Sequence, residues 1–358
     1  MKLLLVARRY PPDVRSGTET VFQSLAEQAQ KHHAVRLVVG FTRDRSLVPE
    51  DAVAVDLRGL GRRQSWQALW WAAMRESRRF KPDVVLANSI EVPALGAPAV
   101  CIVHDLNFGI DRRDAGTRAR ELFYRFKSRR LKAVVTVSQA SMERLVEVGV
   151  PAERIQVIHN GVDLQRFQPS ETPPPEGGLR FTYPSRILPG KGQHLAIDAF
   201  ARLPKRLKQR SSLDIVGAVV DPVFLDQLKV QSHGLSVTFN TDVPAIAPFY
   251  QRADVVLFPT LMQEGFGFTA IEGMACAKPV VWSEQPAIRE ATGGIGLPFQ
   301  AGQVEQMRDQ MQRLIEEPEL VKKLGAEGRD YVASHYAWPA VWKRYEDLLS
   351  QVASQAKR

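Results

Sequence analysis

Short apolar runs alternate with amphipathic stretches along the whole chain. In the first half the apolar runs cover residues 3–7, 35–39, 84–87, 100–103 and 134–137, and in the second half residues 181–184, 213–217, 237–239, 255–258 and 280–282. They are brief and rich in Val, Leu and Ile, as buried parallel strands are, and most are separated by apolar positions at helical spacing. The pattern predicts an α/β protein with two doubly wound parallel sheets covered by helices.

The two halves meet at a Pro/Gly-rich segment. Residues 168–178 include four prolines and two glycines, a composition that suits neither a helix nor a central strand, so we interpret the segment as a linker. The expected domains are residues 1–167 and 179–337. Residues 338–358 are expected to form a helix that packs back toward the first domain. Because ligands of such folds bind outside the carboxyl ends of the strands, we expect the domains to face each other across a ligand-binding cleft.

Composition excludes a membrane-spanning protein. The chain has 358 residues, enough for roughly two domains, and no run near the ~18 uncharged apolar residues that a spanning helix needs. The first ten residues contain an apolar core too short for a secretion signal, so we interpret them as a buried strand. The two cysteines, Cys101 and Cys276, have no partner at metal-ligand spacing. A reduced, cytoplasmic setting is expected.

The formal charge of +9 is concentrated in the first half. Residues 58–81 hold seven Lys/Arg and one acid, and residues 111–132 hold nine Lys/Arg and three acids, so each segment carries +6. A nucleic-acid binder is disfavoured because neither segment has interleaved stacking aromatics. The first segment contains a probable helix with arginines around an apolar face, which comprises Trp66, Leu69, Trp70, Ala73 and Met74. Either this face packs on the sheet, or the helix contacts an anionic membrane from the cytoplasmic side.

A glycine-rich turn between two glutamates is the most informative local pattern. Glu264 and Glu272 bracket the sequence EGFGFTAIE, which follows the apolar run 255–258. A strand-to-helix turn of this kind presents free backbone N–H groups and the positive end of a helix dipole to an anion. Nearby carboxylates can accept hydrogen bonds from hydroxyls. The combination indicates a ligand with phosphate and sugar groups, although an isolated pair of glutamates would more often be solvated or capping.

Two cations stand at the equivalent junction after the linker. Arg186 and Lys191 lie between the apolar run 181–184 and a helical stretch. A planar guanidinium and a mobile ammonium together suit a diphosphate whose negative charge grows as it departs. The segment is not a Walker A loop because it lacks Gly at position 185 and Ser/Thr at position 192.

Two further candidates lie in the first half. Ser16 and Glu19 fit a capping box at a helix start, and Gly17 there would also let a phosphate approach the backbone. His104 ends the strand-like run 100–103, where the carboxyl end should open on the cleft, although Asp105 beside it would be an adequate structural partner.

Taken together, these segments resemble glycosyltransferase family 4, retaining sugar transferases of the GT-B architecture. The resemblance covers nearly the whole chain, and the order and spacing of its pieces are more specific than any single piece. The residues that carry it are Tyr10-Pro11-Pro12, Ser16-Gly17, His104-Asp105, Val137-Ser138, IQVIHNGVD at 155–163, Arg186, Lys191-Gly192, LDIVG at 213–217, EGFGFTAIE at 264–272 and Pro279-Val280-Val281.

The resemblance implies roles for residues of the second half. Arg186 and Lys191 are expected to hold the donor diphosphate. Glu272 is expected to bind the ribose hydroxyls, and Glu264 the transferred sugar. Backbone donors to the sugar and phosphate are expected from Gly265, Phe266, Gly267 and Phe268.

In the first half, the resemblance implies that Gly17 closes over the phosphate and that His104 lies beside the donor sugar. The residues expected to act in catalysis are His104, Arg186, Lys191 and Glu264. No metal and no cofactor are expected, because the two cations take the place of a metal ion. Two departures from the family pattern are Ser16 and Ala277, where family members often carry glycine; a left-handed Ala277 would cost ~1 kcal/mol.

The sequence therefore predicts a retaining, metal-independent glycosyltransferase. The donor is expected to be a nucleotide diphosphate sugar, with UDP favoured over GDP. The acceptor is expected to be a hydroxyl of a glycan or a lipid-linked or anionic acceptor, in cell-envelope polysaccharide or lipopolysaccharide synthesis. A sugar-nucleotide sensor of the same fold without catalysis is the alternative.

Overall fold

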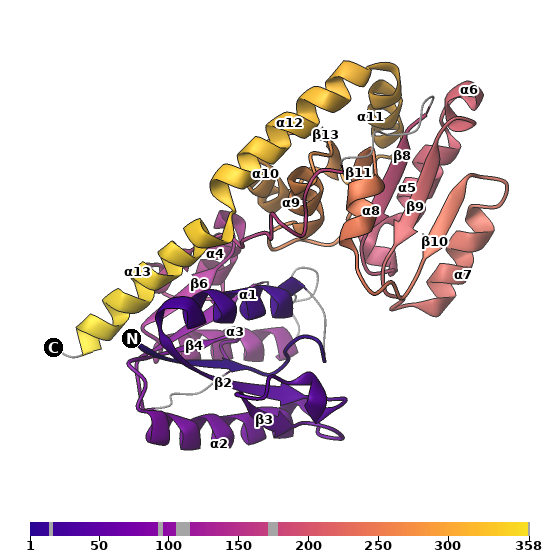
Figure 1. Cartoon of the computed structure of the whole chain (residues 1–358). Helices are drawn as coiled ribbons and strands as arrows, with labels where there is room; N and C mark the ends of the chain where they lie inside the picture. Colours follow the sequence, from indigo (N-terminus) through magenta and orange to yellow (C-terminus); the bar gives the residue numbers. More distant parts are fainter. Residues whose placement is uncertain (14–16, 92–95, 105–114, 171–177, 357–358) are drawn as a thin grey trace. The chain divides into compact units, whose positions relative to one another are not determined.

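The chain folds into two units, each built on a parallel sheet. The computed structural model describes residues 1–13, 17–91, 96–104, 115–170 and 178–356 (Figure 1). Unit 1 comprises Met1–Gly161 and Trp338–Arg358, and unit 2 comprises Val162–Ala337. Most of the expected linker, residues 171–177, lies outside the described residues. The expected first domain ended at residue 167, whereas residues 162–167 pack on unit 2, where the Arg329 guanidinium donates to the Phe167 carbonyl at 2.9 Å.

Unit 1 contains a seven-stranded sheet in the order β3-β2-β1-β4-β5-β6-β7, with all neighbours parallel. The central strands are buried along their length, which explains their near-continuous apolar sequence. The strands are β1 (Lys2–Ala7), β2 (Ala34–Phe41), β3 (Val53–Asp56), β4 (Val84–Ala87), β5 (Ala99–Val103), β6 (Ala133–Thr136) and β7 (Ile155–Val157).

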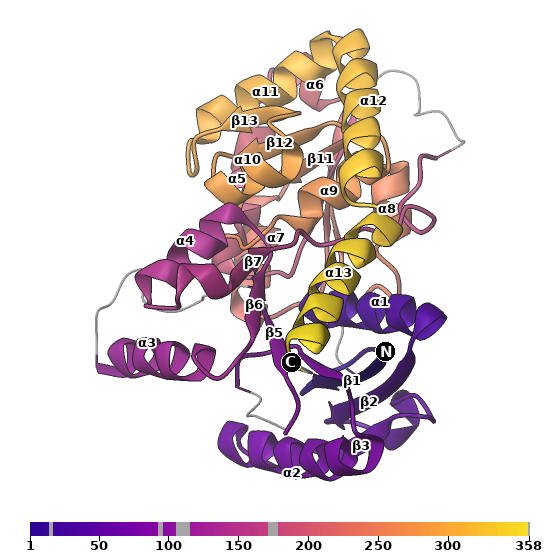
Figure 2. The ribbon, with the colours of Figure 1, turned by 90° about the vertical axis from the view of Figure 1, so that its left-hand side faces the viewer.

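Helices cover both faces of this sheet. Helices α1 and α13 lie together on one face and α2 on the other (Figure 2). The helices are α1 (Gly17–His32), α2 (Arg62–Phe80), α3 (Ala115–Ser128), α4 (Gln139–Glu147) and α13 (Trp338–Ala356). Along α13, Trp342, Tyr345 and Leu349 are buried as their spacing predicted, and His33 bonds Glu346 at 2.9 Å.

Unit 2 contains a six-stranded parallel sheet in the order β10-β9-β8-β11-β12-β13. Its strands are β8 (Arg180–Pro184), β9 (Ser212–Val216), β10 (Val237–Asn240), β11 (Val255–Phe258), β12 (Val280–Ser283) and β13 (Leu297–Phe299). Its helices are α5 (Gln193–Ala201), α6 (Lys205–Lys208), α7 (Pro222–Gln231), α8 (Ala247–Arg252), α9 (Phe268–Ala275), α10 (Pro286–Thr292), α11 (Val304–Glu316) and α12 (Pro318–His335).

The strand order of each sheet reverses at one point. In unit 1 the chain proceeds outward from β1 to β3 and then restarts at β4, which pairs with β1. In unit 2 it proceeds from β8 to β10 and restarts at β11, which pairs with β8. In open α/β sheets, ligands bind outside the carboxyl ends of strands at such switch points. The loops after β1 and β4, and those after β8 and β11, are therefore the places to look for a site.

The face of α2 that the sequence left open between sheet and membrane packs on the sheet. Leu69 and Ala73 are fully buried, and Trp66, Trp70 and Met74 pack against the same core cluster. The interpretation of this face as an ordinary amphipathic surface is thus confirmed. Among the described residues, no helix is both long and apolar enough to cross a membrane.

Ala277 ends α9 in a left-handed conformation. Its φ is 56°, and the Lys278 N–H beyond it bonds back to the Gly273 carbonyl at 3.0 Å, as in a helix C-terminus that normally carries glycine.

We expect Ala277→Gly to raise the free energy of unfolding by about 0.5–1 kcal/mol, because glycine adopts this conformation without strain and part of the gain is offset by its larger unfolded-state entropy. Urea denaturation measures the change. The control is Ala201→Gly in the helical last turn of α5, which should destabilise. A loss of stability in Ala277→Gly would contradict the strain.

Candidate active site

The glutamate-flanked turn of unit 2 joins β11 to α9, at the switch point of its sheet. Gly267 precedes the first helical residue with a φ of 109°, a conformation that a side chain would strain. Phe266 is buried, with its ring edge-to-face against Tyr336. The Thr269 hydroxyl donates to the Pro184 carbonyl at 3.0 Å and so ties the first turn of α9 to the end of β8. This rigid turn aims the N-terminus of α9 at the carboxyl ends of β8 and β11.

Lys191 and Glu264 meet in a partly buried ion pair at this edge. The Lys191 ammonium lies 2.5 Å from Glu264 Oε1, and their side chains are 13% and 16% exposed. The Thr260 hydroxyl donates to the same oxygen at 2.9 Å. Of the expected site residues, these two are thus brought into direct contact, although they are far apart in the sequence.

The loops that carry this pair are fastened by side chains. The Gln285 amide donates to the Met262 carbonyl at 3.0 Å and accepts from the Glu264 N–H at 3.1 Å. The Tyr183 hydroxyl donates to the Lys191 carbonyl at 2.5 Å. These contacts hold both ends of the ion pair in position without a ligand.

Arg186 lies on the surface beside them. Its carbonyl accepts a hydrogen bond from the buried Gln193 side chain at 2.8 Å, which fixes its backbone in the loop after β8. Within the described part of the chain, its guanidinium forms no ion pair. Arg186 therefore supplies a positive charge that no protein carboxylate neutralises.

Glu272 lies in the second turn of α9, as predicted. Burial raises its pKa to about 7, opposed by a hydrogen bond from the Tyr250 hydroxyl and by the charge of Arg166. Tyr250 is itself fully buried, and burial raises its pKa well above the usual range. Near neutral pH, Glu272 is thus poised between its acid and its carboxylate.

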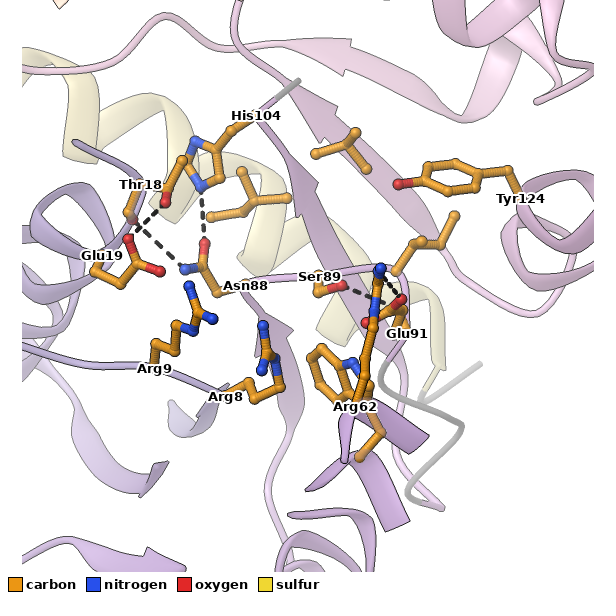
Figure 3. Close-up of a pocket in the computed structure, with 14 residues that line it drawn as sticks. Arg8, Arg9, Thr18, Glu19, Arg62, Asn88, Ser89, Glu91, His104 and Tyr124 are labelled. Carbon is orange, nitrogen blue, oxygen red and sulfur yellow. Dashed lines mark hydrogen bonds and ion pairs between the residues drawn. The ribbon is translucent and has the colours of Figure 1, made fainter. Parts of the chain in front are cut away.

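His104 follows β5 of unit 1 and is held by an asparagine. Its Nε2 lies 2.8 Å from Asn88 Oδ1, so Nε2 carries the proton, and its buried Nδ1 has no hydrogen-bond partner (Figure 3). Burial lowers its pKa to about 4, so the ring is neutral at physiological pH. The partner suggested by the sequence, Asp105, lies outside the described residues. His104 therefore presents a lone pair that can accept a hydrogen bond.

Gly17 is exposed and is the first residue of α1. Ser16, the expected capping residue, lies outside the described residues. The next residue, Thr18, approaches the His104 partner: its carbonyl lies 3.5 Å from Asn88 Nδ2. The start of α1 and His104 thus belong to one neighbourhood at the switch point of unit 1.

Sequence reasoning missed the residues that support these groups. Asn88 directly follows β4, Thr260 follows β11, and Gln285 follows β12. The signal was available, because a polar residue just past a buried parallel strand stands at the ligand-binding edge of its sheet. Tyr250 lies on α8 and gave no such signal.

Sequence comparison decides the family. The sequence model of Glycosyltransferase Family 4 matches residues 15–166, and that of Glycosyl transferases group 1 matches residues 165–331. The chain belongs to glycosyltransferase family 4.

Two relatives of this glycosyltransferase illustrate its range. It is 27% identical over 251 residues to the D-inositol 3-phosphate glycosyltransferase of Streptomyces bingchenggensis, covering 63% of this chain and 53% of that protein. It is 28% identical over 242 residues to the MMP alpha-(1->4)-mannosyltransferase of Mycolicibacterium hassiacum, covering 63% and 57%. The glycosyltransferase thus spans less than two thirds of the length of these curated relatives.

Solved structures share its fold. The crystal structure of Anabaena HepE with UDP and glucose has a TM-score of 0.80 at 20% identity, covering 98% of this chain and all of that one. The crystal structure of WaaG, a glycosyltransferase involved in lipopolysaccharide biosynthesis, has a TM-score of 0.76 at 17% identity, covering 98% and 99%. At these identities the likeness establishes the GT-B fold alone.

Proposed function

We propose that this glycosyltransferase moves a sugar from a nucleotide diphosphate sugar to an acceptor hydroxyl and retains the anomeric configuration. The observation that carries the proposal is the Lys191–Glu264 pair beside Arg186 at the switch point of unit 2. Cations and a helix N-terminus suit a diphosphate, and a carboxylate between them suits sugar hydroxyls. UDP is the preferred nucleotide in this proposal, and GDP the next.

In the proposed reaction, the bond between the anomeric carbon and the diphosphate oxygen breaks, and a bond to the acceptor oxygen forms on the same face of the sugar. The acceptor proton passes to the departing diphosphate. Arg186, Lys191 and the N-terminus of α9 stabilise the charge that grows on this leaving group. No protein nucleophile takes part.

Each remaining residue has a role in binding. Glu264 accepts hydrogen bonds from the transferred sugar, and Glu272 accepts them from the ribose. Neutral His104 accepts a hydrogen bond from a sugar hydroxyl through its free Nδ1. Backbone N–H groups of the turn and of the start of α1 face the phosphates and sugar; they belong to Gly17, Gly265, Phe266, Gly267 and Phe268.

The proposed reaction needs no metal ion, because Arg186 and Lys191 supply the charge that a metal would supply elsewhere. The acceptor is proposed to be a glycan or lipid-linked hydroxyl in cell-envelope polysaccharide synthesis. We place the protein on the cytoplasmic side, which its two free, buried thiols favour.

The test is release of nucleotide diphosphate from a panel of UDP- and GDP-sugars, with and without glycan acceptors and with EDTA. Expected are a donor-specific rise in Tm, turnover that an acceptor accelerates, and activity that survives EDTA. Anomeric NMR of the product reports retention. Donor binding without any turnover, even with crude membrane lipids and glycans as acceptors, would favour a sensor instead.

Contact with an anionic membrane is part of the proposal, carried by apolar side chains on the surface of unit 1. Trp71 is 64% exposed among Arg75, Arg78 and Arg79 on α2. On α3, Leu122 is 64% and Phe126 53% exposed, and the Arg130 guanidinium lies 4.5 Å from the centre of the Phe126 ring. Exposed apolar groups flanked by arginine suit an anionic lipid interface.

We expect the protein to float with vesicles containing phosphatidylserine or phosphatidylglycerol but not with neutral vesicles. Leu122→Ser with Phe126→Ser should reduce flotation, because both lose apolar area that enters the interface. Val230→Ser, which changes an equally exposed side chain in unit 2, is the control. Absence of flotation in the unchanged protein would rule the contact out.

A further inference from the structure

Unit 1 holds a cavity next to His104 that none of the donor-binding roles uses. It encloses about 710 Å³ of space, part of it open to solvent, within the range of ligand pockets. Residues that follow β1, β4 and β5 line it, together with side chains from α1, α2 and α3 (Figure 3). The cavity therefore lies at the switch point of the unit 1 sheet.

Two arginines at the end of β1 give this cavity an unneutralised charge. Arg8 and Arg9 both line it, and their guanidinium groups point into it side by side (Figure 3). Neither forms an ion pair within the described ranges, whereas the neighbouring Arg62 pairs with Glu91. Two adjacent guanidinium groups without a carboxylate make a site for a bound anion.

The environment of Arg8 supports this interpretation. Arg8 is half-buried, and its pKa is lowered first by burial and then by the charge of Arg9. An anion between the two side chains would relieve both the desolvation and the repulsion. The empty cavity thus holds charges that a complementary ligand would stabilise.

Aromatic side chains line the cavity beside these arginines. The Arg8 guanidinium lies 5.8 Å from the centre of the Trp66 ring, and Tyr124 also faces the cavity. The Trp66 Nε1 is buried without a hydrogen-bond acceptor. An aromatic face with a free N–H suits a ring that is apolar on its faces and carries hydroxyls at its edge, as sugars and cyclitols do.

We infer that this cavity binds the acceptor, and that the acceptor is a sugar or cyclitol with an anionic group, a phosphate ester or a carboxylate, which Arg8 and Arg9 hold. The inference rests on the proposed function. His104 lines the same cavity, so an acceptor hydroxyl at that end lies where the donor sugar is proposed to be presented. The anionic group occupies the arginine end.

Binding of matched ligand pairs to the full chain tests this inference. The ligands are glucose 6-phosphate and glucuronate against glucose, and inositol 1-phosphate against inositol, by titration calorimetry at low ionic strength. We expect at least one anionic ligand to bind about tenfold more tightly than its neutral parent, the effect of a charge-assisted contact. Phosphate esters and carboxylates form separate arms, so the result also identifies the anion.

Substitutions locate the effect. Arg9→Gln, at an exposed side chain, and Arg8→Gln should each reduce the preference for the anion to about threefold or less. Arg43→Gln removes one exposed arginine after β2, outside the cavity, and should keep the preference. Equal binding of all anionic and neutral ligands, or a preference that survives Arg9→Gln, would overturn the inference.

Two further measurements separate the possible causes. Inorganic phosphate that binds as tightly as every sugar phosphate would show an anion site that does not select an acceptor, and so would count against the inference. A larger loss of UDP-sugar affinity than of sugar-phosphate affinity in Arg9→Gln would assign the arginines to the donor instead. Donor-dependent nucleotide release on the same preparation tests the proposed function by itself, so the two can fail separately.

Discussion

Lys191→Ala is expected to lower kcat by about 10²–10³-fold, the effect of removing one preorganised group that stabilises a developing negative charge. The ammonium has little influence on the unbound donor that bulk water would not also have, but it gains a full interaction as the diphosphate departs. Nucleotide release under saturating donor measures the loss.

Stability has to be separated from turnover, because Lys191 also neutralises Glu264. Loss of this pair should cost about 1–2 kcal/mol of unfolding free energy, which leaves the protein folded while the Thr260 hydroxyl still serves Glu264. Arg186→Ala removes an exposed guanidinium with no described ion-pair partner, so it should lower kcat without a change in Tm. Lys229→Ala, which breaks an exposed pair with Asp226 in the same unit, is the matched control. Unchanged kcat in both Lys191→Ala and Arg186→Ala would remove the basis of the diphosphate clamp.

Glu272 should make donor binding depend on pH. Its pKa is raised to about 7 in the free protein, so its carboxylate, which accepts two hydrogen bonds from a ribose diol, is lost as pH falls through 7. The dissociation constant of a UDP-sugar should therefore rise about tenfold between pH 8 and pH 6, with proton release on binding. A UDP-sugar is the right probe because its diphosphate has no proton to lose in this range.

Glu272→Gln should weaken donor binding about tenfold or more at pH 8 and remove this pH dependence. The free protein provides a second measurement. A carboxyl whose pKa is raised on folding contributes stability at low pH that is lost as pH rises through about 7, and Glu272→Gln should abolish that component. Glu290→Gln on α10 is a control with the same change of charge. A pH dependence that persists in Glu272→Gln would assign the titration to another group.

The sequence predicted the central strands because they are buried on both sides. Runs such as 84–87 and 255–258 coincide with β4 and β11, since every residue there is apolar. It missed β3 and β13, which are short edge strands with partly exposed positions and so lack a continuous apolar run. The predicted strand 134–137 became Ala133–Thr136, while Val137 precedes the Ser138 cap of α4.

The site was predictable where chemistry and position coincide. Glu264 and Lys191 stood out because charged residues beside glycines follow buried strands, but their direct contact could not be foreseen, since it depends on how far β8 and β11 are staggered in the sheet. Asn88, Gln285 and Tyr250 act by holding other groups. Such supporting roles depend on side-chain packing across elements, which no local pattern records.

Unit 1 is assembled from two distant parts of the chain. Its helix α13 is separated from the rest by the whole of unit 2, and Trp342, Tyr345 and Leu349 are buried in it. During translation, the face of α1 that meets α13 stays uncovered until the ribosome has made everything in between, whereas unit 2 is continuous and can fold as soon as it emerges. The half of the enzyme that is synthesised first is therefore completed last, and chaperones have most reason to bind that uncovered face.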